Sequence, residues 1–428
     1  MKSKSVWWVL LGLLLLFTAV ACKSTPPQAE PTPPQGAAQD NDSAPPDQAA
    51  LNDLNDAASR ALAARKFVMD FDGPALFPSD WQSADSLYTQ AEQQKRNSTR
   101  RETRESIDRY NNAANAFEAM KDKTLAQYYS NKEKELTDAR DAAVRAGVGD
   151  LAPDYLLDAD NTVADAVARY QGRDYYAAKD TAEEALSKYT LLAYGADVYY
   201  VRVDVVDAGA EELVPDLLDK ADNAGLDAID KYIAKNYTGA KNSAANAESM
   251  YGNLKAGLAA YKVREEIANR DFEVYDPQNI ELADDTLRSA ADDYNAGNFS
   301  AAKDKADAAL VRYNLALRTA WESYSAEKGA DASTERQKAL DAKANVAVRD
   351  DFNSAQAIYV RANSAFQAGD HEGAANLYLQ CQSMFTDTAR TALQKRQAAD
   401  AALNRANQKL TESDETARNA EVILEGGM

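Results

Sequence analysis

Histidine and cysteine are nearly absent from this chain of 428 residues. It has one histidine, His371, and two cysteines, Cys22 and Cys381. A zinc site built from cysteine and histidine needs about four such ligands, and these three residues are scattered along the sequence. A nucleophile activated by histidine would have to depend on His371 alone. The composition therefore predicts no metal site and argues against histidine-dependent catalysis.

Motifs of cofactor and nucleotide chemistry are also missing. The sequence has no glycine loop that would cradle phosphate, no G-x-S-x-G elbow and no zinc signature. Basic residues are outnumbered, because 48 lysines and arginines stand against 68 aspartates and glutamates and give a net charge of −20. An acidic surface repels phosphate backbones, so we expect no nucleic-acid partner. We also expect no cofactor.

Proline is scarce in most of the chain and concentrated near its start. Seven of the twelve prolines lie between Pro26 and Pro46, in a stretch with almost no large apolar residue. Such a segment cannot bury a core. Residues 22–50 are therefore predicted to form an extended, mobile tether, and residues 51–424 to form the folded body.

The first 22 residues read MKSKSVWWVLLGLLLLFTAVAC, with a basic start, a short apolar run and small residues before a cysteine. This pattern predicts a bacterial export signal over residues 1–21. TAVAC resembles the lipobox of bacterial lipoproteins, and its relaxed form, with Ala19 where leucine is commonest, is similar to those of spirochaetes. The resemblance implies that Cys22 is acylated and anchors the protein in the cell envelope, on the periplasmic face or cell surface of the outer membrane. The alternative is ordinary cleavage after Ala21, which would leave Cys22 as a free thiol.

The remaining prolines reveal a repeat. Three of them recur at one constant interval, and each opens a segment of the form P-x5-A-D-x5-A-x3-Y. They are Pro153, Pro215 and Pro277, and their segments end at Tyr170, Tyr232 and Tyr294. Pro78 opens a similar unit, and a fifth unit lacks the proline but has Phe352 in phase. We expect units that begin near residues 78, 153, 215, 277 and 349.

Each repeated residue type has a structural explanation. A proline at the first helical position has a preset φ and no N–H to satisfy, so the prolines are expected to begin helices. Asp174 follows the turn after the tyrosine and is expected to cap a second helix. Alanines two helical turns apart, such as Ala178 and Ala185, lie on one face and let a neighbouring helix come close. His371 holds the position that Tyr175 holds in an earlier unit.

A helix that ends in tyrosine, a turn with glycine and aspartate, and a second helix with regularly spaced alanines together resemble the tetratricopeptide-repeat hairpin. The units here are longer, 62 to about 75 residues against 34 in that family. The segments after residue 190 either extend the second helix or form a third, and Gly195 and Gly257 mark where a bend or break would fall. We expect an all-α fold, an array of about five tetratricopeptide-like helical hairpins with longer helices.

Acidic residues recur in phase with the repeat at Asp160, Asp222 and Asp284. They could form a ladder of carboxylates for cations or for a basic peptide. We expect instead that each forms a salt bridge with a lysine or arginine of the next helix. The natural partners are the lysines that recur in the same phase, Lys179, Lys241 and Lys303.

One clearly basic stretch, KRNSTRRETR at residues 95–104, lies in this acidic chain. Arg100, Arg101 and Arg104 are candidates for binding an acidic partner or the glycan wall, and the alternative is a solvent-exposed turn. Tyrosine pairs occur at residues 175–176 and 199–200. We expect one member of each pair in the core, which makes Tyr176 and Tyr200 candidate contacts with a protein partner.

Two functions fit these observations. Stacked helical units build extended binding surfaces, so we expect a lipid-anchored envelope scaffold, not an enzyme, whose repeats bind a protein partner or assemble an envelope complex. The alternative is a peptidoglycan-associated enzyme or an accessory subunit of one, because paired carboxylates can cleave sugars. The sequence singles out no such pair among its 68 acidic residues.

Overall fold

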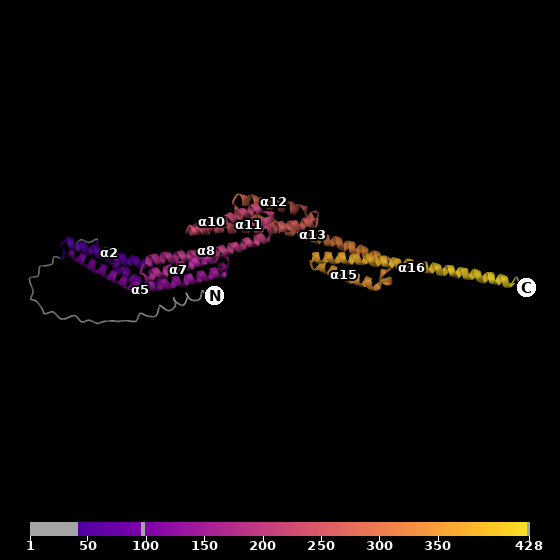
Figure 1. Cartoon of the computed structure of the whole chain (residues 1–428), viewed down its shortest axis with the longest axis horizontal. Coiled ribbons are helices and arrows are strands. Elements are labelled where there is room, and N and C mark those ends of the chain that lie inside the picture. Colours follow the sequence, from indigo (N-terminus) through magenta and orange to yellow (C-terminus); the bar gives the residue numbers. More distant parts are fainter. Residues whose placement is uncertain (1–41, 96–98, 426–428) are drawn as a thin grey trace, which may run out of the picture. The chain divides into compact units, whose positions relative to one another are not determined.

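The computed structural model describes residues 42–95 and 99–425 (Figure 1). Of these residues 91% are helical and none lies in a strand, so the predicted all-α class is confirmed. The chain divides into two compact units, which meet in the sequence at Asn131 and Lys132. Each unit is described by itself below.

Within the described residues, the first unit consists of α2 (Gln48–Asp70), the one-turn α3 (Gly73–Leu76), α4 (Pro78–Gln94) and the part of α5 (Arg100–Arg145) up to Asn131. Its core is formed by α2, α4 and α5 together, with Val68, Ala84 and Phe117 fully buried. Helix α2 begins at Gln48, slightly before the predicted start of the body, because Asp47 caps it by accepting the N–H of Ala50.

The second unit begins with the last part of α5 and alternates short and long helices. They are α6 (Val148–Leu151), α7 (Pro153–Gln171), α8 (Tyr175–Asp207), α9 (Ala210–Leu213), α10 (Pro215–Ile233), α11 (Tyr237–Asn269), the 3-10 helix η1 (Phe272–Val274), α12 (Pro277–Asn295), α13 (Phe299–Asp341), α14 (Ala344–Ala347), α15 (Arg349–Gln367) and α16 (His371–Glu425). The four predicted prolines each stand at the start of a helix.

The turns between paired helices match the predicted chemistry. Asp174 caps α8 by accepting the N–H of Ala177, and Asn236 caps α11 by accepting that of Gly239. Across each turn two aromatic rings pack together, with centroids 5.1–5.7 Å apart. The pairs are Tyr170 with Tyr175, Tyr232 with Tyr237, Tyr294 with Phe299, and Phe366 with His371. His371 is therefore the structural counterpart of Tyr175, as the sequence predicted.

Each short helix packs against the long helix that follows it, so the predicted hairpins are present as α7 with α8, α10 with α11, α12 with α13 and α15 with α16. Consecutive long helices also pack on one another, as α8 does on α11 and α11 on α13. The segments after residue 190 extend the second helix, and α8 and α11 continue through Gly195 and Gly257 without a break. Each core therefore contains three helices.

A long helix serves two successive cores. In α8, Ala185 and Tyr189 are buried with α7, whereas Val198 and Val205 are buried with α10 and α11. The last part of one long helix, the short helix that follows and the first part of the next long helix thus share one hydrophobic cluster. The predicted hairpin supplies two of the three helices of such a core, and the preceding long helix supplies the third.

Three of these cores contain the same polar cluster. Asp222 of α10 accepts two hydrogen bonds from the guanidinium of Arg202 in α8, at 2.7 and 2.8 Å, and a third from the hydroxyl of Tyr251 in α11 at 2.6 Å. One carboxylate therefore connects all three helices of its core. The other two clusters are Arg140, Asp160 and Tyr189, and Arg264, Asp284 and Tyr313.

The predicted salt bridges of the repeated aspartates are thus present, but the lysine partners were wrong. Each aspartate pairs with an arginine 20 residues before it, on the preceding long helix. Lys303, one of the predicted partners, instead pairs with Asp307 within its own helix. Arginine suits the site because its planar guanidinium matches both carboxylate oxygens at once.

The fifth core carries a natural variant of the cluster. Gln356 takes the place of the aspartate and accepts from Arg336 Nε at 2.5 Å, while Phe385 takes the place of the tyrosine and is fully buried. The tyrosine hydroxyl and the carboxylate that accepts from it are therefore absent together. In the first unit Asp85 accepts from Arg65 at 2.6 Å, again with a spacing of 20 residues.

We expect Asp222→Ala to lower the free energy of unfolding by about 2 kcal/mol, because it leaves a half-buried guanidinium unpaired. The double variant Asp222→Gln, Tyr251→Phe copies the fifth core and should cost only about 1 kcal/mol. Urea unfolding followed by circular dichroism measures both. An equal loss in the two variants would contradict the assignment.

The effect of Asp222 should depend on pH. The hydrogen bond from Arg202 lowers the pKa of the Asp222 carboxyl, although burial opposes it. A carboxyl with a lowered pKa in the folded state stabilises the fold above its unfolded pKa, about 3.9, and loses that contribution as the pH falls through its folded value. The difference in stability between the wild type and Asp222→Asn should therefore shrink below about pH 4.

Candidate functional site

The sequence-predicted arginines lie at the start of α5, and the chain itself contacts them. The N–H of Arg100 donates to the carbonyl of Ala44 at 2.8 Å, and that of Arg101 to the carbonyl of Asp42 at 3.2 Å. The side chain of Arg104 forms an ion pair with Asp42. The residues just before α2 therefore pack onto this basic stretch, and part of its charge is neutralised within the unit.

Tyr176 and Tyr200 do not form one site, because they lie near opposite ends of α8, about 36 Å apart along the helix. Both are about half exposed. The expectation that one of Tyr199 and Tyr200 is in the core is wrong, since both are exposed and Val198 fills the core position. The Tyr200 hydroxyl lies over Gly147, where an added Cβ would come within 2.8 Å of it. The predicted lipidation site, Cys22, lies outside the described residues.

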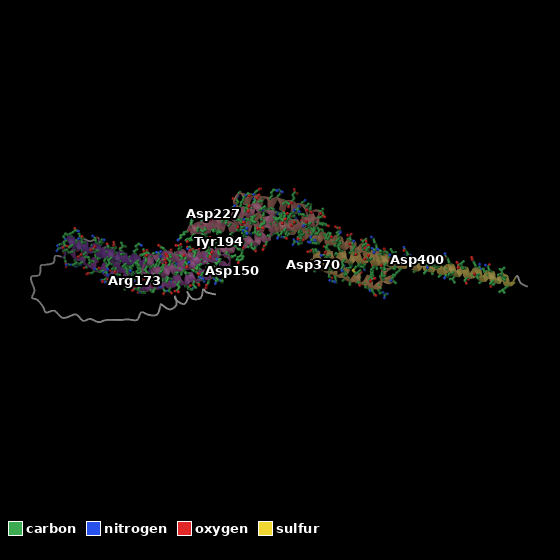
Figure 2. The ribbon with its side chains drawn as sticks, viewed as in Figure 1. Asp150, Arg173, Tyr194, Asp227, Asp370 and Asp400 are labelled. Carbon is green, nitrogen blue, oxygen red and sulfur yellow. The ribbon has the colours of Figure 1, made fainter. Side chains whose placement is uncertain are left out.

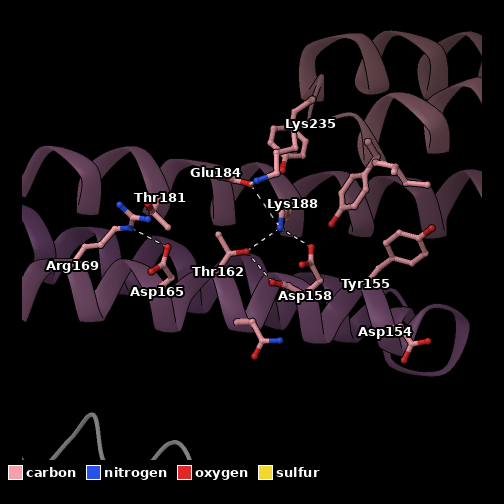
Figure 3. Close-up of a pocket in the computed structure, with 14 residues that line it drawn as sticks. Asp154, Tyr155, Asp158, Thr162, Asp165, Arg169, Thr181, Glu184, Lys188 and Lys235 are labelled. Carbon is pink, nitrogen blue, oxygen red and sulfur yellow. Dashed lines mark hydrogen bonds and ion pairs between the residues drawn. The ribbon is translucent and has the colours of Figure 1, made fainter.

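The structure shows a site that the sequence interpretation missed. A pocket of about 620 Å³ lies in the second unit, between the α7–α8 pair and the turn that joins α10 to α11 (Figure 3). Charged groups and tyrosine rings line it. Its principal residues are Tyr155, Asp158, Thr162, Glu184, Lys188, Tyr232, Lys235 and Tyr237.

Lys188 is the buried charge of this pocket. The residue is 5% exposed, and its Nζ donates to Asp158 Oδ2 at 2.5 Å and to Thr162 Oγ1 at 2.9 Å. Glu184, one turn earlier on α8, lies 3.8 Å from the same nitrogen. Figure 3 shows these groups converging from α7 and α8. A buried ammonium needs such partners, since burying a charge without them is costly.

Glu184 connects the pocket to the next hairpin. Its Oε1 accepts from Lys235 Nζ at 2.9 Å and from the Tyr237 hydroxyl at 3.0 Å. Burial favours the neutral acid, but these two hydrogen bonds and the positive charges of Lys235 and Lys188 together outweigh it, so the pKa of Glu184 is lowered. The carboxylate therefore stays ionised at neutral pH and holds the α10–α11 turn against α8.

The aromatic wall contains an unsatisfied polar atom. The Tyr232 ring packs edge-on against Tyr155, with centroids 5.5 Å apart, and also contacts Tyr237 at 5.7 Å. Its hydroxyl is buried and has no hydrogen-bond partner among the described residues. A buried hydroxyl without a partner is costly. In the next unit the equivalent hydroxyl, of Tyr294, donates to the carbonyl of Leu217 at 2.9 Å.

The pocket is a departure from the repeat. At the equivalent positions of the next unit, 62 residues later, five of its polar or aromatic residues are replaced by other residue types. Tyr155, Asp158, Thr162, Glu184 and Lys188 become Leu217, Lys220, Ala224, Asn246 and Met250. Met250 is buried in the hydrophobic cluster of its own core. The polar pocket is therefore not required by the fold, and comparing the units position by position would have revealed it.

The chemistry of the pocket suits recognition of a polar group. It offers donors from Lys188 and Lys235, acceptors from Asp158 and Glu184, and tyrosine faces beside them. Ligand sites of this kind combine a few placed polar groups with aromatic walls. Within the described residues, no three His, Cys, Asp or Glu side chains lie where they could together hold a metal ion.

Comparisons with known proteins add no family. The chain matches no protein-family model, no curated protein and no solved structure. None of the described helices has a stretch long and apolar enough to cross a membrane.

We expect Lys188→Met to leave the thermal unfolding midpoint unchanged or to raise it. Met250 fills the equivalent position, and the substitution removes the cost of keeping the ammonium of Lys188 out of water. Asp158 would remain hydrated, since more than half of its side chain is exposed. Lys188→Ala, which also removes the packing of the side chain, should lower the midpoint. An equal loss in both variants would mean that the lysine is structural.

Proposed function

We propose that this protein is a non-catalytic binding scaffold of the bacterial cell envelope, anchored by a lipid on Cys22. Its helical repeats bind a protein partner, and the pocket around Lys188 is the point of contact. One observation carries the proposal: one junction of the repeat buries a lysine, Lys188, beside a tyrosine hydroxyl, that of Tyr232, which has no hydrogen-bond partner among the described residues. The next unit has Met250 in place of the lysine, and its tyrosine hydroxyl is hydrogen-bonded. Residues that the fold does not require are best explained by recognition.

The groups of the pocket suggest what a partner would present. A backbone carbonyl or a side-chain oxygen would accept from the buried Tyr232 hydroxyl once the side chains that cover it move aside, and the tyrosine rings would pack against apolar parts of the same segment. A peptide segment supplies both kinds of group. Arg100, Arg101 and Arg104, together with Tyr176 and Tyr200, remain further candidate contacts of the scaffold.

The alternative, an enzyme acting on peptidoglycan or a subunit of one, needs a carboxylic acid with a raised pKa to protonate the leaving group. In the pocket the pKa of Glu184 is lowered instead, through hydrogen bonds from Lys235 and Tyr237. Asp158 is held by the ammonium of Lys188. This arrangement favours binding over general acid catalysis.

A cross-linked pull-down from envelope with the intact lipoprotein tests the binding site. We expect Lys188→Met, Tyr232→Phe to lose a partner that the wild type captures, because the buried ammonium and the Tyr232 hydroxyl are both removed. The matched control is Tyr294→Phe, which removes the equivalent hydroxyl of the next unit and should retain the partner.

Three further results would each rule out one part of the proposal. If charge reversal at Arg100, Arg101 and Arg104 leaves the partners unchanged, the basic stretch is not a contact. If the pocket variant keeps every partner of the wild type, the pocket is not the binding site. If purified protein degrades cell-wall polymer and one carboxylate substitution stops it, the scaffold proposal itself is wrong.

The lipid anchor has a separate test. We expect Cys22→Ala to move the protein from the detergent phase to the aqueous phase on partitioning, because an acyl chain supplies the membrane affinity. Cys381→Ala is the control, since burial raises the pKa of that thiol to about 11 and makes it unreactive. A Cys22→Ala protein that stays with the membrane would contradict acylation.

A further inference from the structure

The last part of α16 differs from every other long helix of the described chain. The last parts of α5, α8, α11 and α13 are each buried in a core with the short helix that follows. In α16, every residue from Leu393 to Leu424 is exposed. This stretch, about 48 Å of helix, is called the α16 extension below; Asp400 lies on it (Figure 2).

The extension carries an apolar stripe. The residues of this stripe follow one another at alternating intervals of three and four, which is the spacing of a coiled-coil seam. They are Ala399, Leu403, Ala406, Leu410, Ala417, Ala420 and Leu424, with Arg396 and Ser413 at the two polar positions of the same series. Leu403, Leu410 and Leu424 are 60%, 63% and 75% exposed. Leucines at this spacing on an exposed helix indicate a missing partner helix.

The stripe continues an interface that already exists. In the first part of α16, the positions buried against α13 and α15 follow the same alternating three-and-four spacing. They are Ala374, Tyr378, Cys381, Phe385, Thr388 and Ala392. The exposed series follows directly, with one interval of four between Ala392 and Arg396. The same face of the helix is therefore buried first and exposed afterwards.

The charges beside the stripe select the occupant. With Leu403, Leu410 and Leu424 at position a of a heptad, the g positions include Lys395 and Lys409, and the e positions include Asp400 and Asp414. In a parallel, in-register pair, a g residue faces the e residue of the following heptad on the other chain. Both lysines then face aspartates of a second copy. In an antiparallel pair, e would face e, and the aspartates would repel.

We propose that the α16 extension forms a parallel, in-register two-stranded coiled coil with the α16 extension of a second copy. Each dimer contains four interchain ion pairs, Lys395 with Asp400 and Lys409 with Asp414 in both directions. Within one chain Asp400 is only loosely paired, 3.9 Å from Arg396. Arg396 occupies an a position and would face the Arg396 of the second copy, and a polar residue at such a position specifies the register of a two-stranded coil at a cost in stability.

Sedimentation equilibrium of the full chain, in density-matched detergent with a reducing agent, tests the proposal. We expect the mass of two chains for the wild type. Leu403→Asp, Leu410→Asp should sediment as one chain with an unchanged unfolding midpoint, because both leucines are exposed in the single chain. A wild type that remains a single chain, or a leucine variant that remains a dimer, would overturn the proposal.

Charge variants test the orientation. Asp400→Lys, Asp414→Lys should weaken dimerisation by about tenfold or more, since four attractive pairs become repulsive. Adding Lys395→Asp, Lys409→Asp should restore it, because each pair is then reversed. In an antiparallel dimer the lysines at e would still face one another, so failure to restore would overturn the parallel arrangement. The control with the same change in charge, Glu412→Lys, Glu415→Lys, lies away from the seam and should dimerise like the wild type.

Discussion

One carboxylate at the centre of a three-helix core is the contact on which the second unit depends. Asp222 accepts from an arginine of the preceding long helix and from a tyrosine of the following one. Only about a quarter of its side chain is exposed. A charge buried to this degree is costly unless both donors pair with it. In three cores this contact joins the short helix to both long helices. Hydrophobic burial stabilises each core.

Sharing of helices explains the repeat length. In α8 and α11 the tyrosine of one cluster precedes the arginine of the next by the same interval, as Tyr251 precedes Arg264. In α13 the interval from Tyr313 to Arg336 is longer by about three turns of helix. That helix has 43 residues, whereas α11 has 33. The longer unit thus arises from added turns of helix rather than from a loop. On such a uniform frame, a polar junction like the one around Lys188 is a deviation that calls for its own explanation.

Local sequence signals predicted much of this fold. They predicted little of which residues pair across different helices. Proline at helix starts, capping residues such as Asp174 and the alanine spacing act within a few residues, so the sequence alone located the starts of the paired helices. The partner of Asp222 was missed because Arg202 lies 20 residues earlier on another helix, and only the overlap of the long helices brings them together. The repeat pattern depends on the positions at which the units agree. The pocket residues lie at positions where the units differ, so the pattern does not reveal them. That the Tyr232 hydroxyl has no hydrogen-bond partner among the described residues follows only from the packing.

Native-state hydrogen exchange along α8 tests most directly whether one continuous helix serves two cores. The amides on both sides of Gly195 should be protected to a similar degree, with no fast-exchanging gap, because the hydrogen-bond ladder runs without interruption from the core of Tyr189 to that of Arg202. Fast exchange confined to the turn around Gly195, with slow exchange on either side, would show two separate helices and contradict the shared-helix architecture.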